Sequence, residues 1–467
     1  MAVQTIGADG RVLVDWRPED SGFWRDQGAM IARRNLWISI AALLFAFAVW
    51  MVWSAVVVNL PRVGFAYSAD QLFWLAALPG LSGATLRIFY SFMVPIFGGR
   101  RWTAISTAAL LVPALGIGFA VQDPSTPYWL FLLLALLCGL GGGNFASSMA
   151  NISFFFPRAQ KGRALALNAG LGNLGVSAVQ LVVPLVITIG IFGALGGAPQ
   201  QLADGGRLWL QNAGFIWVPF IAAAAIAAWF GMNDIASAKA SFAEQSVIFQ
   251  RKHNWIMCLL YTGTFGSFIG FSAGFPLLIK QQYPEVDPLH FAFLGPLVGS
   301  LARSASGGLA DRVGGGRVTF FVFVVLAAGD LLLLFFLSLG DNALGFWGFL
   351  ATVLLLFAAT GVGNASTFQM IPVIFRIDRE RAYAEREGSP VSPEVVHQEA
   401  EREAAAVIGF TSAIAAYGAF FIPKSFGSSI AMSGGPEPAL YGFFLFYVLC
   451  IVVTWVEYSG RNAEIRC

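Results

Sequence analysis

Twelve apolar segments, each about as long as a membrane-spanning helix, dominate this chain of 467 residues. A helix of about 20 apolar residues crosses the hydrocarbon core of a bilayer. Hydrophobic residues make up 57% of the chain and charged residues 12%, whereas a soluble domain has about 25% charged residues. We therefore expect an all-α polytopic membrane protein. The segments are 36–59, 71–97, 102–122, 128–155, 163–192, 213–232, 254–279, 288–309, 317–339, 343–375, 404–424 and 438–458.

The cationic residues between these segments predict the orientation of the chain. Cytoplasmic loops of membrane proteins are enriched in Lys and Arg. With both termini in the cytoplasm, the outer loops of this chain hold only Arg62, Arg207, Lys280 and Lys424 of its 28 Lys and Arg residues. We therefore expect both termini to be cytoplasmic. The formal net charge of +2 is too small to predict a nucleic-acid partner.

Two arginines, Arg87 and Arg303, lie inside apolar segments, near their middles. A cation at the centre of a membrane helix costs roughly 2.5–3.5 kcal/mol on insertion scales and usually marks a substrate or ion path. The two arginines are 216 residues apart. The same offset aligns Leu78 with Leu294, Gly83 with Gly299, Gly98 with Gly314 and Arg101 with Arg317. One feature is thus present twice, and it predicts an anionic ligand.

A second match extends this repeat. The segment 141–149, GGGNFASSM, resembles 361–368, GVGNASTF, at an offset of 220 residues. A repeat of six plus six helices is an architecture of secondary transporters, which bind substrate near the midplane between their halves. We therefore predict two pseudo-symmetric six-helix bundles. The predicted parts are a cytoplasmic segment 1–35, a first bundle 36–232, a cytoplasmic linker 233–253, a second bundle 254–458 and a cytoplasmic tail 459–467.

The segment 307–317 has the pattern Gly-x3-Asp-Arg-x-Gly-x2-Arg. It resembles the cytoplasmic loop signature of the major facilitator superfamily. The resemblance implies that Asp311, Arg312 and Arg317 form a latch on the cytoplasmic side. In the first half the same loop is degenerate, because Pro95 replaces the aspartate.

The glycine-rich segments narrow the resemblance to the nitrate/nitrite porter family, and the stretch 144–157, NFASSMANISFFFP, is its most specific piece. Closely spaced glycines let membrane helices approach each other, so a role in conformational switching is implied. One departure is Ala365, where the second motif often has glycine. The signature residues are Gly141, Gly143, Asn144 and Ser147, with Gly361, Gly363, Asn364 and Ser366.

The resemblance also implies the substrate-binding residues of a nitrate/nitrite antiporter that works by alternating access. A guanidinium group is planar and permanently charged, so it suits the flat nitrate ion through paired hydrogen bonds. Aromatic rings above and below the anion would exclude tetrahedral ions. The implied residues are Arg87, Arg303, Asn173, Tyr261, Phe145 and Phe265.

Acidic residues are almost confined to loops and helix ends, and Asp330 is the exception. A proton-coupled transporter generally needs a titratable relay inside the membrane, so this deficit argues against proton coupling. The resemblance implies that the span with Asp330 is peripheral and does not face the substrate. We expect Asp330 to pair with a neighbouring polar group or to act as a moderately exposed cap. A proton–nitrate symporter remains the nearer alternative.

A more distant alternative is a non-transporting anion sensor that signals through the charged segment 376–403. The favoured interpretation of that segment is an exposed loop without partners, and a short amphipathic helix is the other. The sequence contains no recognisable nucleophile–base pair, metal-binding cluster or phosphate-binding loop. We therefore expect no enzymatic activity, no cofactor and no metal. We expect a monomer in the cytoplasmic membrane of a bacterium.

Overall fold

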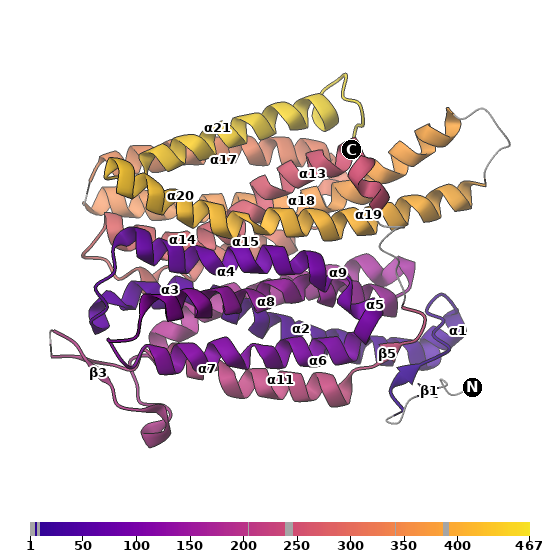
Figure 1. Cartoon of the computed structure of the whole chain (residues 1–467). Helices are drawn as coiled ribbons and strands as arrows, with labels where there is room; N and C mark the ends of the chain where they lie inside the picture. The colour runs from indigo at the N-terminus through magenta and orange to yellow at the C-terminus, as the bar shows by residue number, and fades with distance from the viewer. Residues whose placement is uncertain (1–4, 7–9, 204, 239–245, 341, 386–391) are drawn as a thin grey trace. The chain divides into compact units, whose positions relative to one another are not determined.

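The computed structural model describes residues 5–6, 10–203, 205–238, 246–340, 342–385 and 392–467, which fold almost entirely as helices (Figure 1). In the first half these are α1 (Ser21–Phe23), η1 (Trp24–Gly28), α2 (Ala29–Met51), α3 (Trp53–Asn59), η2 (Pro61–Val63), α4 (Ala69–Tyr90), α5 (Met93–Phe97), α6 (Gly99–Ala109), α7 (Leu111–Ala120), α8 (Tyr128–Phe155), α9 (Arg158–Val186), η3 (Gly193–Gly196), α10 (Asn212–Phe215) and α11 (Trp217–Gly231).

The second half continues with η4 (Ser246–Gln250), α13 (Lys252–Tyr261), η5 (Thr262–Gly266), α14 (Ser267–Gln282), η6 (Pro288–His290), α15 (Leu294–Ala305), α16 (Leu309–Val313), α17 (Gly315–Ser338), α18 (Ala343–Ala384), α19 (Pro393–Ala416), α20 (Gly418–Ser433), α21 (Glu437–Thr454) and η7 (Trp455–Ser459). Five two-residue strands, all outside the long helices, are β1 (Thr5–Ile6), β2 (Val12–Leu13), β3 (Gln200–Gln201), β4 (Arg207–Leu208) and β5 (Asp234–Ile235).

By length and composition, eleven helices of the described chain can cross a membrane. The predicted all-α membrane fold is therefore confirmed. The remaining predicted segment, 288–309, is broken into η6, α15 and α16, and α15 has only 12 residues. Its helix ends before the pair Gly307-Gly308, because glycine is a poor helix former.

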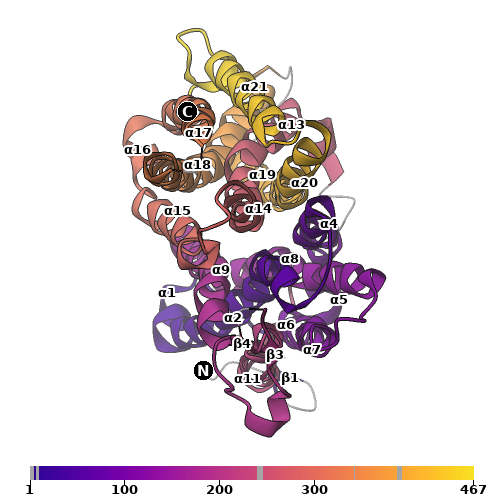
Figure 2. The same cartoon turned by 90° about the vertical axis from the view of Figure 1, so that its left-hand side faces the viewer.

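Contacts group the chain into two units. The first comprises Met1–Ala240, Ser272–Leu294 and Ala419–Gly427, and the second comprises Ser241–Phe271, Gly295–Gly418 and Ser428–Cys467. In the first unit, α4 packs on α8 and α2 packs on α9; in the second, α17 packs on both α18 and α21 (Figure 2). The six-helix boundaries taken from the repeat stay a prediction.

Part of α20 belongs to the first unit because it packs tightly on α4. A side chain at Gly80 would overlap the backbone of Ala419. Lys424 Nζ lies 2.5 Å from Asp70 Oδ1 and 4.7 Å from the centre of the Trp74 ring. The predicted topology places both charged residues on the outer side of the membrane, so this ion pair agrees with it.

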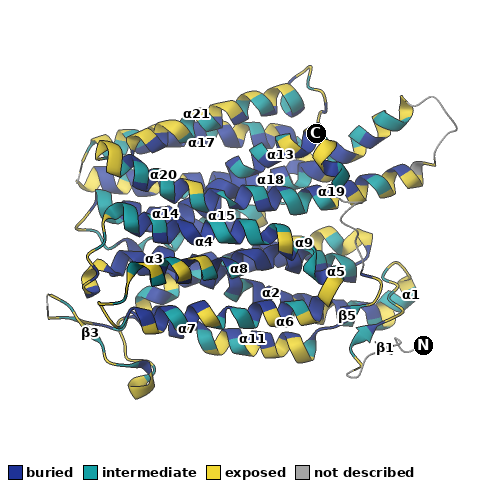
Figure 3. Ribbon diagram, in the orientation of Figure 1, coloured by how far each residue is buried: buried dark blue, intermediate teal, exposed yellow. Residues whose placement is uncertain are grey.

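Burial differs strongly between the helices. In the most apolar stretch of Ser21–Asn59, which contains α2, and of Lys252–Gln282, which contains α13 and α14, 83% of the residues are buried. The corresponding value for Glu437–Ser459, which contains α21, is 28%, and exposed residues line α21 in Figure 3. Exposed positions on α21 are mostly large and apolar, such as Leu445, Leu449 and Val452, which suits a surface that faces lipid.

The repeat is visible in the local geometry of one turn. In each half a five-residue helix, α5 or α16, is followed by a glycine with positive φ and then by a longer helix, α6 or α17. The φ angles are +86° at Gly98 and +99° at Gly314. Residues with a Cβ rarely adopt this conformation, so both turns require glycine.

In the first half, Asp234 supplies a carboxylate to the loop in which Pro95 replaces the expected aspartate. The backbone N–H of Arg100 donates to Asp234 Oδ1 (2.8 Å) and its Nε donates to Asp234 Oδ2 (3.2 Å). The exposed fractions of the two side chains are 1% and 8%. Strand β5, which contains Asp234, pairs in parallel with β2, and this pairing ties the N-terminal segment to the linker.

We predict that Asp234→Asn destabilises the protein, because the charge of Arg100 would stay buried without its counterion. Breaking a buried pair in this way costs about 3–5 kcal/mol. Thermal unfolding in detergent, followed by tryptophan fluorescence, measures the effect. Asp15→Asn is the matched control, since Asp15 pairs with Arg17 at 3.1 Å but both are about half exposed. Equal melting temperatures for the two variants would contradict the prediction.

Candidate functional site

Arg87 is buried in the first unit, with an exposed fraction of 1%. Its Nε donates to the carbonyl oxygen of Gly142 on α8 (2.9 Å). Arg87 lies in the last turn of α4, not near the middle of a helix as predicted, because the apolar segment 71–97 is divided between α4 and α5. A cation is favoured at this end of a helix by the helix dipole.

Three aromatic rings surround the Arg87 guanidinium. Its Cζ lies 4.6 Å from the centre of the Phe145 ring, 5.0 Å from that of Trp50 and 6.0 Å from that of Phe47. Trp50 Nε1 donates to the carbonyl oxygen of Pro79 (2.7 Å), which fixes the indole against α4. Cation–π contacts of desolvated groups contribute about 2 kcal/mol. Phe145 therefore lies next to Arg87, and its role in substrate binding stays a prediction.

The sequence argument missed Trp50 and Phe47. They are three residues apart on α2 and therefore share one face of that helix. This spacing alone could not have identified the pair, because aromatic residues at helical spacing are common in membrane helices.

Asn173 lies on α9 in the same unit and is 1% exposed. Within the described part of the chain, neither its Oδ1 nor its Nδ2 has a hydrogen-bond partner. A buried amide without partners is costly, which suits a residue that hydrogen-bonds to a ligand. Its predicted role in substrate binding stays a prediction.

Arg303 belongs to the second unit and also lies in the last turn of its helix, α15. Its Cζ is 5.9 Å from the centre of the Phe368 ring, and its side chain is partly exposed. The inaccessible Nη1 has no hydrogen-bond partner among the described residues. The prediction of a mid-helix position is again wrong, because α15 ends at Ala305.

Tyr261 and Phe265 stack on each other in the second unit, with ring centres 5.5 Å apart and planes at 17°. Phe265 lies in the π-helical turn η5, and such turns are frequent at functional sites. The ring of Phe368, which the sequence argument did not select, is 6.4 Å from that of Tyr261. Phe368 therefore connects the two predicted aromatic residues to Arg303.

The signature glycines sit where helices cross closely. A Cβ at Gly141 would overlap the carbonyl oxygen of Ala46 on α2, and one at Gly361 would overlap that of Gly299 on α15. A Cβ at Gly143 would come within 2.9 Å of Tyr90, and one at Gly363 within 2.6 Å of Thr264. The close approach expected from these motifs is therefore present within each unit.

The polar signature residues are all buried. Ser147 Oγ donates to the Asn144 carbonyl oxygen (3.3 Å), and Ser366 Oγ is 2.8 Å from Thr319 Oγ1. Within the described residues, Asn364 Oδ1 has no hydrogen-bond partner. The Ser366 hydroxyl thus contacts α17, whereas the Ser147 hydroxyl bonds within α8.

Of the three predicted latch residues, Arg312 and Arg317 are exposed, and the side chain of Asp311 lies outside the described part of the structure. Their role as a latch stays a prediction.

Asp330 is fully buried on α17, and neither carboxylate oxygen has a hydrogen-bond partner in the part of the chain that the structure describes. The expectation of polar pairing or exposed capping is therefore wrong. A carboxylate in such surroundings is strongly disfavoured unless it is protonated.

The segment 376–403 is not an exposed loop without partners. Helix α18 extends to Ala384 and α19 begins at Pro393; residues 386–391 lie outside the described residues. Arg251 donates two hydrogen bonds to Glu403, of 2.9 and 2.7 Å, and these bonds raise the pKa of Arg251. The charges of this segment thus help to join α18, α19 and the start of α13.

Comparison with known proteins supports the predicted family. The model of the Major Facilitator Superfamily matches residues 38–379. The chain is 53% identical to the nitrate/nitrite transporter NarU of Escherichia coli (strain K12) over 99% of both chains. It is 54% identical to NarU of Salmonella typhimurium over 97% of both. It is 44% identical to the probable nitrate/nitrite antiporter NarK2 of Thermus thermophilus, over 98% of this chain and 99% of that protein.

We predict that Gly142→Ala lowers both thermal stability and nitrate binding. The new Cβ would lie 2.7 Å from Trp50 Cε2 and 2.9 Å from Gly83 Cα, so the carbonyl that holds Arg87 must move. Calorimetric titration with nitrate and thermal unfolding measure the two effects. Gly162→Ala, on α9 with no atom within 4 Å of the new Cβ, is the control and should stabilise by about 1 kcal/mol. Unchanged nitrate binding in Gly142→Ala would count against the assigned role of Gly142.

Proposed function

The chain belongs to the major facilitator superfamily and, within it, to the nitrate/nitrite transporters; we propose that it exchanges nitrate for nitrite across a bacterial cytoplasmic membrane. The relatives named above are nitrate/nitrite transporters or a probable nitrate/nitrite antiporter. The proposed direction is nitrate import against nitrite export, with both termini in the cytoplasm.

One observation carries the proposed site: each half has an arginine at the same repeat position, in the last turn of a helix and close to at least one aromatic ring. We assign Arg87 and Arg303 as anion ligands, each with its own aromatic partners. Guanidinium forks bind flat oxyanions through paired hydrogen bonds. Flat rings favour nitrate and nitrite over tetrahedral sulfate or phosphate by shape.

Exchange without a proton follows from the charges. Two guanidinium groups brought to about 7 Å repel by roughly 2.4 kcal/mol at an effective dielectric constant of about 20. An anion between them replaces this repulsion with two attractions, so closure around the site is favourable only when the site is loaded. Nitrate and nitrite are both monoanions, so one-for-one exchange moves no net charge.

The second candidate function is proton–nitrate symport, and the burial of Asp330 is the observation that favours it. Asp330 lies on α17, which packs on α18, and α18 carries Phe368. In this mechanism Asp330 carries the proton and releases it during the transport cycle.

We predict that Arg87→Lys and Arg303→Lys each lower the kcat/KM of nitrate transport roughly 10- to 100-fold, because an ammonium group lacks the planar fork and loses charge-assisted hydrogen bonds of about 1.5–3 kcal/mol. Uptake of labelled nitrate into proteoliposomes measures this. Arg17→Lys, at an exposed arginine, should transport normally. Normal transport by either pocket variant would refute the assigned site.

We also predict that labelled nitrate enters proteoliposomes only when they are preloaded with nitrite or nitrate. Empty vesicles should take up no nitrate even with an inward proton gradient. In an exchanger the binding site can return to the outer side only with an anion bound, and empty vesicles supply none.

Asp330→Asn separates the two candidates, because asparagine has the same shape but cannot release a proton. Exchange predicts normal counterflow in this variant. Gradient-driven uptake into empty vesicles, lost in Asp330→Asn, would establish symport and overturn the exchange mechanism.

A further inference from the structure

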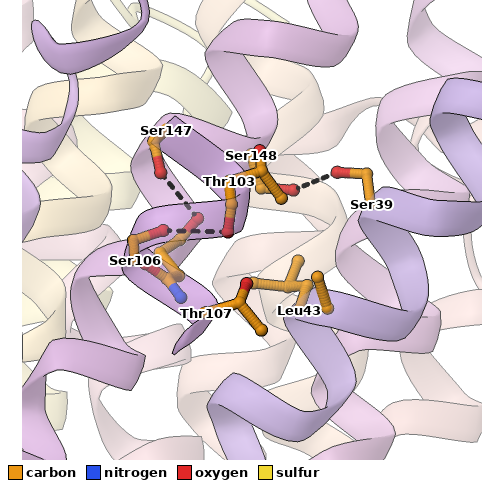
Figure 4. A pocket seen from close by; sticks show the side chains of 9 residues that line it. Ser39, Leu43, Thr103, Ser106, Thr107, Ser147 and Ser148 are labelled. Carbon is orange, nitrogen blue, oxygen red and sulfur yellow. Dashed lines mark hydrogen bonds between the residues drawn. The ribbon is translucent and has the colours of Figure 1, made fainter. Parts of the chain in front are cut away.

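A small cavity lies in the first unit among residues of α2, α6 and α8 (Figure 4). Neither Arg87 nor the three aromatic residues around it are among the residues that line the cavity. Its volume is about 10 Å³, close to the minimum that holds one water molecule. Every residue that lines it is buried. Its polar lining consists mainly of Ser39, Ser106, Thr107, Asn144, Ser147 and Ser148.

Two polar atoms of this lining have no hydrogen-bond partner among the described residues. They are Thr107 Oγ1 on α6 and Asn144 Oδ1 on α8, and the exposed fractions of these residues are 0% and 5%. Leaving a buried donor or acceptor unpaired costs about 1–3 kcal/mol. Two such atoms on the wall of one cavity therefore call for a small polar ligand between them.

The other hydroxyl groups of the lining differ in the lengths of their hydrogen bonds. Ser39 Oγ and Ser148 Oγ are 2.7 Å apart, and Asn168 Nδ2 donates to Ser148 Oγ (2.8 Å). In contrast, Ser106 Oγ and Ser147 Oγ make long bonds, of 3.4 and 3.3 Å, to backbone carbonyls of their own helices. These hydroxyls can turn toward a ligand, so the cavity offers the two to four partners that a buried water needs.

The second half of the chain treats the equivalent position differently. The offset of 216 residues aligns Thr107 with Phe323, which is fully buried and packs against Gly263. An aromatic ring fills this position in the second half, whereas a threonine and a cavity occupy it in the first.

We propose that this cavity binds one structural water molecule. The Thr107 hydroxyl donates to the water, and the water donates to Asn144 Oδ1. Bridging waters of this kind are nearly as favourable as direct hydrogen bonds. The neutral lining, with no charged side chain, selects water over an ion.

The bound water connects to the anion site through α8. Asn144 is two residues beyond Gly142, whose carbonyl accepts from Arg87, and it directly precedes Phe145. Holding Asn144 to α6 therefore fixes the segment of α8 that positions the arginine. This water site does not depend on whether the chain exchanges anions or transports protons.

The test is a structure of the full chain in lipid, at a resolution that shows ordered water elsewhere in the protein. We expect one density peak between Thr107 and Asn144 in the unmodified protein and in Thr107→Ser, which keeps the hydroxyl. The peak should be absent in Thr107→Val, which removes it, and in Thr107→Phe, which fills the space. Thr454→Val is the control, since the buried Thr454 hydroxyl already donates within its helix (2.7 Å), and it should keep the peak.

No peak in the unmodified protein would overturn the proposal. A peak that persists in Thr107→Val, or one with the short contacts of a metal ion, would also overturn it. Thermal unfolding adds a second measure: the melting temperature should fall in Thr107→Val, which loses the bridge, and return to that of the unmodified protein in Thr107→Ser. A melting temperature that is unchanged or raised in Thr107→Val would count against the bridge.

Discussion

The burial of a guanidinium group among membrane helices is the constraint on which much of the first half depends. Arg87 cannot lose its charge, so its desolvation must be offset where it lies. The offsets are the Gly142 carbonyl, three aromatic rings and the C-terminal end of α4. These contacts restrict the sequence. Position 142 on α8 must be glycine, because a Cβ there would overlap Trp50 and Gly83, and Trp50 needs the hydrogen bond to the Pro79 carbonyl.

The second half meets the same constraint with fewer contacts. Arg303 is partly exposed, faces one ring at 5.9 Å, and keeps a donor without a partner among the described residues. The two halves also differ elsewhere in the repeat. Asp234 accepts a hydrogen bond from the first-half loop that lacks its own aspartate, and Thr107 of the first half aligns with Phe323 of the second. Duplication thus preserved the backbone turn at Gly98 and Gly314 while the polar contacts around it diverged.

The sequence predicted the helical membrane fold, the repeat and the family, because hydrophobicity and motif spacing are local properties. It did not predict that Arg87 and Arg303 end their helices, since an apolar run conceals a helix break. The pairing of Arg100 with Asp234, 134 residues away, was also out of reach, because partners distant in sequence leave no local pattern. Asp330, which has no hydrogen-bond partner in the described part of the chain, shows the same limit: burial depends on neighbouring helices, which the α17 sequence does not reveal.

Helix α4 links the proposed anion site to the contact with α20. Asp70, Trp74 and Gly80 meet the α20 segment, and Arg87 follows Gly80 by two helical turns, or about 10 Å. Pro79 lies within the region that contacts α20, directly before Gly80, and removes one helical hydrogen bond, so α4 can bend there. Because Arg87 and that contact share one helix, a change in the position of the arginine is transmitted to the contact along a continuous backbone.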